Sequence, residues 1–305
     1  MAKTRAHATS DGVNLPLLPL ASWKDTQATL HMWTQIVGKV RLELTPLVNH
    51  WWNVPLYVDT RGLTTSLIPY GNGAIEIAFD FIDHKLRMES CDAGMCELAL
   101  KPQSVAALYR ELMTALRDLG VAVKIWTMPQ EVPDPIRFEK DEVHASYDAE
   151  AAHRFWRILT WVDGVLKDFR APFLGKVSPV HFFWGSFDLA VTRFSGRPAP
   201  PRPGADRVTA EAYSHEVSSA GFWPGGGDIA GPAFYCYAAP EPEGFASQPV
   251  RPRAASYHPA MKEFLLMYDD VRTAESPKAA LLEFLQSTYV AAANQGRWDR
   301  KALER

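Results

Sequence analysis

The chain has 305 residues, which is long enough for one large domain or two domains of ordinary size. Apolar residues make up 47% of it and charged residues 22%, as is usual for a globular protein. The net charge of −3 gives no basic surface, which argues against nucleic acid as a partner. Ten tryptophans are a high count and favour broad aromatic surfaces or a pocket with aromatic walls.

Cysteine content and hydropathy indicate a cytoplasmic protein. The three cysteines, Cys91, Cys96 and Cys236, cannot all pair and form no Cys-x-x-Cys motif, so a reducing compartment fits best. No apolar run approaches the ~20 residues needed to cross a bilayer. The stretch from Leu15 to Ala21 is short, broken by prolines and unlike a signal peptide. We therefore expect no membrane partner.

The first half of the chain begins with an arm, a helix and three strands. Residues 1–20 read as a loose arm, and Ser22 then begins a helix in which apolar residues recur with a helical period. The segments that follow are extended, and two of them alternate apolar and polar residues. The three predicted strands are residues 54–60, 74–82 and 96–100.

A second helix closes this first repeat. Ser104 is its N-cap and Gly120 stands where a helix-ending glycine belongs. The repeat as a whole covers residues 21–127. Residues 128–147, with several prolines and many charges, form a connector.

The elements predicted for the second half follow the same order. A helix begins at Ala149, and the last helix runs from Ser276 to Gly296. Three strands are predicted between them, at residues 179–194, 210–218 and 233–238. This second repeat covers residues 148–305 and carries loop inserts at 196–207 and 221–259, which are rich in proline and glycine.

Matching residues suggest that the two halves are copies. "HWW" at His50 resembles "HFFW" at His181, and the separation from His50 to His84 equals that from His181 to His215. We therefore expect the α+β class, with two diverged helix–three-strand–helix repeats packed as one pseudo-twofold unit with antiparallel sheets.

The segment Pro179–Arg197 places ionisable residues among aromatic ones. Gly185 and Ser186 predict a break in the strand, with Asp188 on the face opposite the core. His181 fits a general base or a metal ligand, and Asp188 its partner. The alternative is a hydrogen-bonded core histidine, with Asp188 bound to backbone N–H groups or to an arginine.

A second cluster follows at Ser214-His215-Glu216. His215 and Glu216 could join His181 and Asp188 in a site of two histidines and a carboxylate that binds a metal, or in acid–base chemistry without metal. The sequence identifies neither a metal nor a cofactor. The alternative for this cluster is a flexible surface turn.

Other residues could hold a substrate. Arg61 and Arg193 occupy matching positions and offer planar donors for a carboxylate, unless they form internal ion pairs with Asp59 and Asp188. His50 is the counterpart of His181. The aromatic walls of the expected pocket are Trp184, Phe222 and Trp223.

These observations favour an enzyme that acts on a small organic acid, although the sequence does not settle whether the chain is an enzyme. The alternative is a non-catalytic protein that binds a flat or apolar ligand or cofactor, and a third is an interaction scaffold. No nucleotide-binding glycine loop or hydrolase nucleophile elbow is present. The oligomeric state does not follow from the sequence.

The chain also resembles a known group of proteins. The stretches "NHWWNVPLYVDTRGLTTS", "PVHFFWGSFDLAVTRFSGR", "HEVSSAGFWPG" and "EFLQSTYVAAANQGRW" resemble a bacterial family of uncharacterised proteins, about 300 residues long, known as a domain of unknown function. The resemblance covers most of residues 20–300 and implies a bacterial source and a single family-length unit. It implies no activity and no functional residues.

Overall fold

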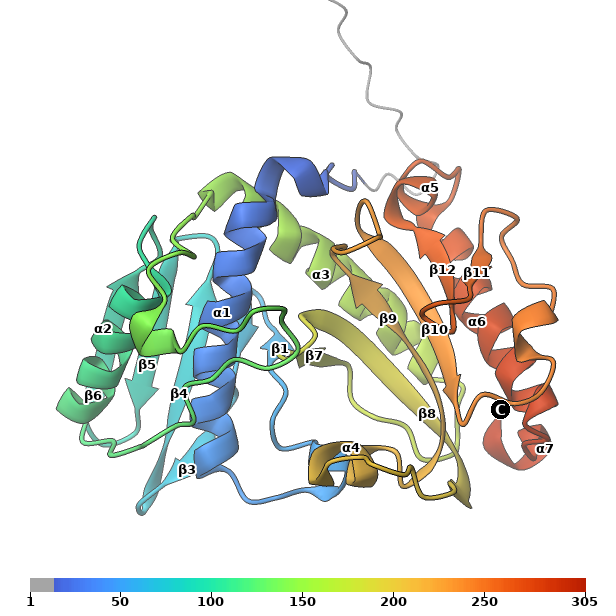
Figure 1. Cartoon of the computed structure of the whole chain (residues 1–305), viewed down its shortest axis with the longest axis horizontal. Helices are drawn as coiled ribbons and strands as arrows, with labels where there is room; N and C mark the ends of the chain where they lie inside the picture. The colour runs from blue at the N-terminus through green and yellow to red at the C-terminus, as the bar shows by residue number, and fades with distance from the viewer. Residues whose placement is uncertain (1–13) are drawn as a thin grey trace, which may run out of the picture. The chain divides into compact units, whose positions relative to one another are not determined.

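The computed structural model describes residues 14–305 and has the α+β class, as predicted (Figure 1). The described residues form seven α-helices and two six-stranded antiparallel sheets. The prediction of three strands for each half is therefore wrong, because several short or charged strands were not recognised. The strand orders of the two sheets also differ, so the internal duplication stays a prediction.

The chain divides into two compact units. The first unit comprises residues 21–160 and 181–188. The second unit comprises residues 161–180 and 189–305, together with the described residues up to Leu20. The first unit thus holds the whole first predicted repeat, the connector, and the short segment that includes His181 and Asp188.

The sheet of the first unit follows β1-β2-β4-β5-β6, with β3 paired to β4. On β4 and β5 the residues of one face are buried, because Ile75, Ile77 and Phe79 alternate with more polar neighbours, as do Leu86 and Met88. The strands are β1 (Tyr57–Val58), β2 (Gly62–Thr64), β3 (Ile68–Tyr70), β4 (Gly73–Asp80), β5 (Lys85–Ser90) and β6 (Gly94–Ala99).

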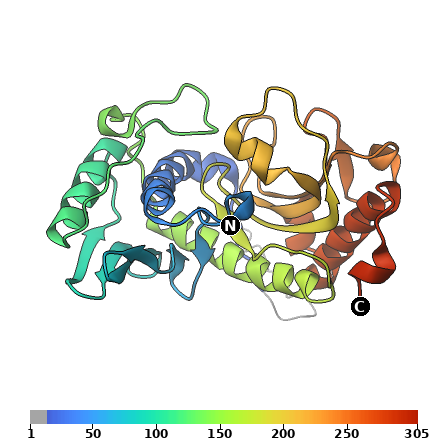
Figure 2. The same ribbon diagram turned by 90° about the horizontal axis from the view of Figure 1, so that it is seen from below.

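The first unit contains most of two helices that were predicted from the sequence. In α2 (Val105–Asp118) the side chain of Ser104 accepts a hydrogen bond from the backbone N–H of Ala107, and Gly120 follows the helix at φ 76°, so both predicted ends are confirmed. α1 (Leu20–Leu44) is buried on nearly all sides between Leu30 and Arg41. Figure 2 shows α1 nearly end-on. The remaining elements are η1 (Asn49–Trp51), η2 (Phe138–Lys140), β7 (His181–Phe183) and the N-terminal part of α3 (Ala149–Arg170).

The second sheet follows β11-β12-β10-β9-β8-β7. Within the second unit, α6 (Pro277–Gln295) packs against β9 and β10, and Figure 1 shows it beside β10. The other elements are β8 (Asp188–Pro198), α4 (Arg207–Ala212), β9 (His215–Trp223), β10 (Ala233–Ala239), η3 (Phe245–Ser247), β11 (Ser256–His258), β12 (Glu263–Met267), α5 (Tyr268–Arg272) and α7 (Arg300–Leu303).

Two predictions for the second half are wrong. The strand expected to begin at Ala210 is the helix α4, because the Asp206 side chain caps it by accepting from the backbone N–H of Thr209 at 2.9 Å. β9 begins only at His215. The loop expected over 221–259 contains the end of β9, η3 and β11 in addition to the predicted strand at 233–238.

The predicted break at Gly185 and Ser186 is confirmed. β7 ends at Phe183 and β8 begins at Asp188, and the turn between them places Phe187 at φ 60°. No helix in the described part of the chain combines the length and the apolar character needed to span a membrane.

Candidate functional site

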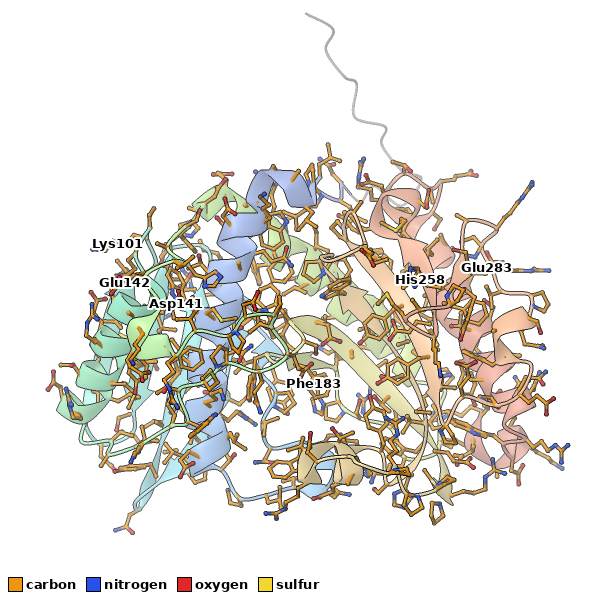
Figure 3. All side chains as sticks on the ribbon, viewed as in Figure 1. Lys101, Asp141, Glu142, Phe183, His258 and Glu283 are labelled. Carbon is orange, nitrogen blue, oxygen red and sulfur yellow. The ribbon has the colours of Figure 1, made fainter. Side chains whose placement is uncertain are left out.

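Two of the predicted histidines meet around one indole ring in the first unit. His181 is fully buried on β7, and its ring lies edge-on to Trp52, Tyr57 and Phe183 with centroid distances of 5.8, 5.7 and 5.4 Å. His50 is also buried, with its ring 5.4 Å from that of Trp52. We call these five residues, together with Arg41, the Trp52 cluster. Figure 3 labels Phe183 within it.

Backbone geometry places the rings of this cluster. His50 and Trp51 both have φ 60°, a left-handed conformation that costs an ordinary residue roughly 1–2 kcal/mol. A pair of backbone hydrogen bonds, each 2.9 Å, joins Leu56 to Phe182 and sets Tyr57 beside His181. Non-glycine residues held in this conformation are concentrated at functional sites, although they also occur in ordinary turns.

Arg41 brings a buried positive charge to this cluster. Its side chain extends from α1, and the residue is only 8% exposed. Nε donates to the carbonyl oxygen of Asn53 at 2.7 Å, and the guanidinium carbon lies 5.4 Å from the centroid of the Tyr57 ring. Nη1 is buried and makes no hydrogen bond to any residue that the structure describes. Burial lowers the pKa of Arg41, because desolvation disfavours the charged form.

Another set of polar side chains on α1 is buried or partly buried. The Nε2 atom of His31 lies 2.8 Å from the carbonyl oxygen of Gly185, Gln35 makes two hydrogen bonds of 2.8 Å with the backbone of Gln130, and Lys39 donates to the carbonyl oxygen of Met128 at 2.9 Å. Gln35 and Lys39 therefore fasten the connector to the helix, whereas His31 contacts the turn at Gly185. Burial lowers the pKa of His31 to about 4 and that of Lys39 to about 8.

The other predicted residues of the first unit make local contacts. Trp184 donates its indole N–H to the carbonyl oxygen of Val54 at 2.8 Å. Arg61 pairs with Asp80 and Asp83, so it forms an internal ion pair, but with partners other than Asp59. Asp188 is buried and its carboxylate accepts from the hydroxyl of Ser186.

Arg193 lies in the second unit and is 1% exposed. Its guanidinium carbon is 3.5 Å from the centroid of the Phe169 ring and 4.3 Å from that of Tyr289, and Nη2 donates to the carbonyl oxygen of Phe169. Burial lowers the pKa of Arg193 to about 10. The guanidinium thus packs in an aromatic cage, which is neither an ion pair with Asp188 nor an open clamp.

The histidine and carboxylate at the start of β9 have separate contacts. The Nδ1 atom of His215 lies 3.1 Å from the hydroxyl of Ser214. One oxygen of Glu216, Oε2, accepts from Nε and Nη2 of Arg197 at 2.9 and 2.6 Å. Glu216 also lines a cavity in the second unit.

The two aromatic residues at the end of β9 differ in burial. Phe222 is fully buried and packs on Phe234 with the ring centroids 5.4 Å apart, so it belongs to the core. Trp223 is partly buried against the side chains of Ile229 and Leu265.

The ten predicted residues are divided equally between the units. His50, Arg61, His181, Trp184 and Asp188 belong to the first, and Arg193, His215, Glu216, Phe222 and Trp223 to the second. Within the described residues, no three His, Cys, Asp or Glu side chains are grouped so that they could hold a metal ion. The metal site suggested for His181, Asp188, His215 and Glu216 is therefore not found there.

Sequence reasoning missed Arg41, Trp52 and Tyr57. A usable signal for Arg41 was present: Lys39 and Arg41 flank Val40 in the most apolar part of the first helix. Charged residues in such a run are either at its solvated edge or buried for a reason. The helical pattern alone favoured the solvated edge.

Comparison with known proteins places the chain in a family. Residues 15–305 match the model described as a family of unknown function, DUF5996. Because the match covers nearly the whole chain, the protein belongs to this family, as the resemblance implied. No curated protein and no solved structure matches the chain.

Proposed function

We propose that the first unit binds a small organic acid at the Trp52 cluster and exchanges protons with it through a histidine. The observation that supports this most is the buried Nη1 atom of Arg41, which has no partner among the described residues. A buried charge costs several kcal/mol unless it is paired. A bound carboxylate would supply the opposite charge and accept a hydrogen bond from Nη1.

The chemistry of the guanidinium favours a carboxylate over other ligands. A planar guanidinium with parallel N–H donors matches the two oxygens of a carboxylate. Arg41 already uses Nε for the carbonyl oxygen of Asn53, which fixes the plane of the group. The donors on its terminal nitrogens are the ones suited to a ligand.

The surroundings of Arg41 suggest what the rest of the acid is like. Trp52, Tyr57 and Phe183 present aromatic rings around His181. Aromatic side chains bury large apolar areas and pack against flat or branched groups. The ligand is therefore an acid with an aromatic or apolar body rather than a strongly hydrated one.

His50 and His181 supply the acid–base chemistry in this proposal. An imidazole can give or take a proton near neutral pH, and two of them contact the same tryptophan ring. His181 is the better candidate because its ring also contacts Tyr57, which lies under the guanidinium of Arg41.

The test compares acids with neutral analogues of the same shape. Small aromatic and branched carboxylates are titrated into the full chain by calorimetry, each beside its primary amide. We expect saturable binding of at least one acid. Its amide should bind at least about tenfold more weakly, because the amide cannot form the charge-assisted hydrogen bond with Arg41. Equal binding of acid and amide, or no binding of any acid, contradicts it.

Substitution of a histidine separates catalysis from binding. In His181→Phe the ring stays in the core while the proton-exchanging group is lost. We expect this variant to bind the acid and to lack any turnover that the unchanged chain shows by product analysis. If neither protein turns the acid over, the chain is a binding protein, which is the alternative function considered for the sequence.

A further inference from the structure

A cavity of about 210 Å³ lies in the second unit, and none of its lining residues belongs to the Trp52 cluster. It is smaller than the ~300–1,000 Å³ pockets that hold drug-sized ligands, so only a compact molecule fits. Its walls come from the start of β9, the end of β10 and the segment after α6, and include Glu216, Val217, Pro240, Pro242, Gly296 and Trp298.

One carboxylate oxygen in the cavity wall can accept further hydrogen bonds. Both hydrogen bonds from Arg197 to Glu216 end on Oε2, at 2.9 and 2.6 Å. Oε1 accepts no hydrogen bond from the residues that the structure describes. Arg197 is not among the residues that line the cavity. A carboxylate can accept about four hydrogen bonds, so Glu216 can bind a further donor.

The C-terminal end of α6 adds negative potential at the same place. The carbonyl ends of a helix carry a partial negative charge that attracts cations. The guanidinium of Arg197 already binds at this end of the helix, because it donates to the carbonyl oxygens of Gly296 and Arg297. This end of the helix therefore attracts N–H donors.

The remaining walls suit an apolar body beside a positive charge. Val217, Pro240 and Pro242 offer no charged groups. Trp298 is 9% exposed, and its ring packs edge-on against Tyr289 with the centroids 6.0 Å apart. An indole face attracts an ammonium ion by roughly 0.5–2 kcal/mol.

We propose that this cavity binds a small organic ammonium ion, with its charge on Oε1 of Glu216 and its carbon body against Trp298 and the prolines. The ligand class is opposite in charge to the acid assigned to the first unit. The two sites share no residue, so either can fail without the other.

The experiment follows the indole N–H signal of Trp298 by NMR in the full, ¹⁵N-labelled chain. Trp298→Phe identifies the signal by its disappearance. Ammonium ions from methylammonium to cyclohexylammonium are titrated to millimolar concentration, beside cyclohexanol and cyclohexanecarboxylate. The proposal expects a saturable shift with at least one ammonium ion and none with the alcohol or the acid. Equal shifts with the alcohol, or none with any ammonium ion, overturn it.

A matched pair of variants tests the role of the carboxylate. Glu216→Gln keeps the shape and removes the charge, and we expect ammonium binding to weaken at least about tenfold. The control is Glu283→Gln, the same change on α6 at a residue outside the cavity lining (labelled in Figure 3), which should leave binding unchanged. Equal effects of the two variants overturn the proposal.

A third variant answers the same question if Glu216→Gln does not fold. Arg197→Gln removes the donor that competes for Glu216, so ammonium binding should tighten. Weaker or unchanged binding in a folded Arg197→Gln variant counts against the site.

Discussion

Arg41 differs in its energetics from an ordinary core residue. Its guanidinium is buried, its pKa is lowered by desolvation, and one terminal nitrogen has no partner among the described residues. A group that destabilises the ligand-free chain in this way is expected where function requires it. The stability of a variant can therefore separate a ligand-binding role from a structural one.

We expect the free energy of unfolding of the Arg41→Met variant to equal or slightly exceed that of the unchanged chain. Methionine fills a similar volume, and replacing a buried, incompletely paired charge with an apolar group is often neutral or stabilising. The carbonyl oxygen of Asn53 also lies 3.2 Å from the hydroxyl of Thr45, which shares its one proton between this oxygen and the carbonyl oxygen of Arg41. Urea denaturation measures the change. A loss of more than about 2 kcal/mol would assign Arg41 a structural role instead.

Arg61→Met is the comparison for that experiment. Arg61 pairs with Asp80, whose side chain is only 3% exposed, so its loss leaves a carboxylate buried without its cation. This variant should be destabilised, in contrast to Arg41→Met.

His31 makes stability depend on acid pH. Burial outweighs the hydrogen bond to Gly185 and lowers its pKa to about 4 from 6.5. As the pH falls from 6.5 towards 4, the unfolded chain takes up a proton at His31 before the folded chain does. The neutral state of His31 therefore contributes about 3 kcal/mol to the free energy of unfolding. This contribution is complete above pH 6.5 and is lost as the pH falls towards 4.

Urea denaturation of the unchanged chain and of His31→Gln at pH 7, 5.5 and 4.5 measures this effect. Glutamine does not titrate, so the stability of the unchanged chain should fall more steeply with acid. Parallel pH profiles of the two proteins would show that His31 is not the group responsible.

At the level of elements, the sequence was most informative where a cap or a glycine marked an end. Ser104 and Gly120 predicted α2, and Gly185 predicted the break before β8. β5 was missed although Leu86 and Met88 alternate with charged residues, because its length and charge resemble a loop. Short strands such as β2 and β3 carry too few residues for a period to be recognised.

The candidate site was only partly predictable for a related reason. His50 and His181 were selected from the sequence because they stand beside aromatic residues. Arg41 was not, since its burial depends on how Asn53 and Tyr57 pack against α1, and a helical period does not contain this information.

The close approach of α1 to Trp184 gives a test of packing. A Cβ atom at Gly38 would lie 2.3 Å from the indole ring, so Gly38→Ala should lower the free energy of unfolding by about 1–3 kcal/mol. The matched control is Gly164→Ala on α3, where nothing lies within 4 Å and a gain of roughly 0.5–1 kcal/mol is expected. Thermal unfolding reports both, and equal effects would contradict the packing around Trp184.

At the level of the whole molecule, the chain interleaves its two units. Residues 181–188 belong to the first unit although residues 161–180 belong to the second. This short segment contributes core contacts, since Phe187 stacks on Phe155 with a centroid distance of 5.3 Å and Trp184 bonds Val54. The first unit is thus incomplete without a distant part of the sequence.

A truncation experiment follows from this connectivity. A fragment of residues 21–160 should show no cooperative thermal transition, because it lacks Phe182, Trp184 and Phe187. A fragment of residues 21–188 restores them and should recover at least part of the transition. Cooperative unfolding of the shorter fragment would mean that the segment is dispensable.

The most direct test of the account is a crystal structure of the full chain with the tightest-binding carboxylate from the calorimetric screen. We expect a carboxylate oxygen about 2.7–2.9 Å from Nη1 of Arg41, with the body of the acid against Trp52. An acid bound elsewhere, or an Nη1 atom already bonded to the protein with no ligand beside it, would contradict it.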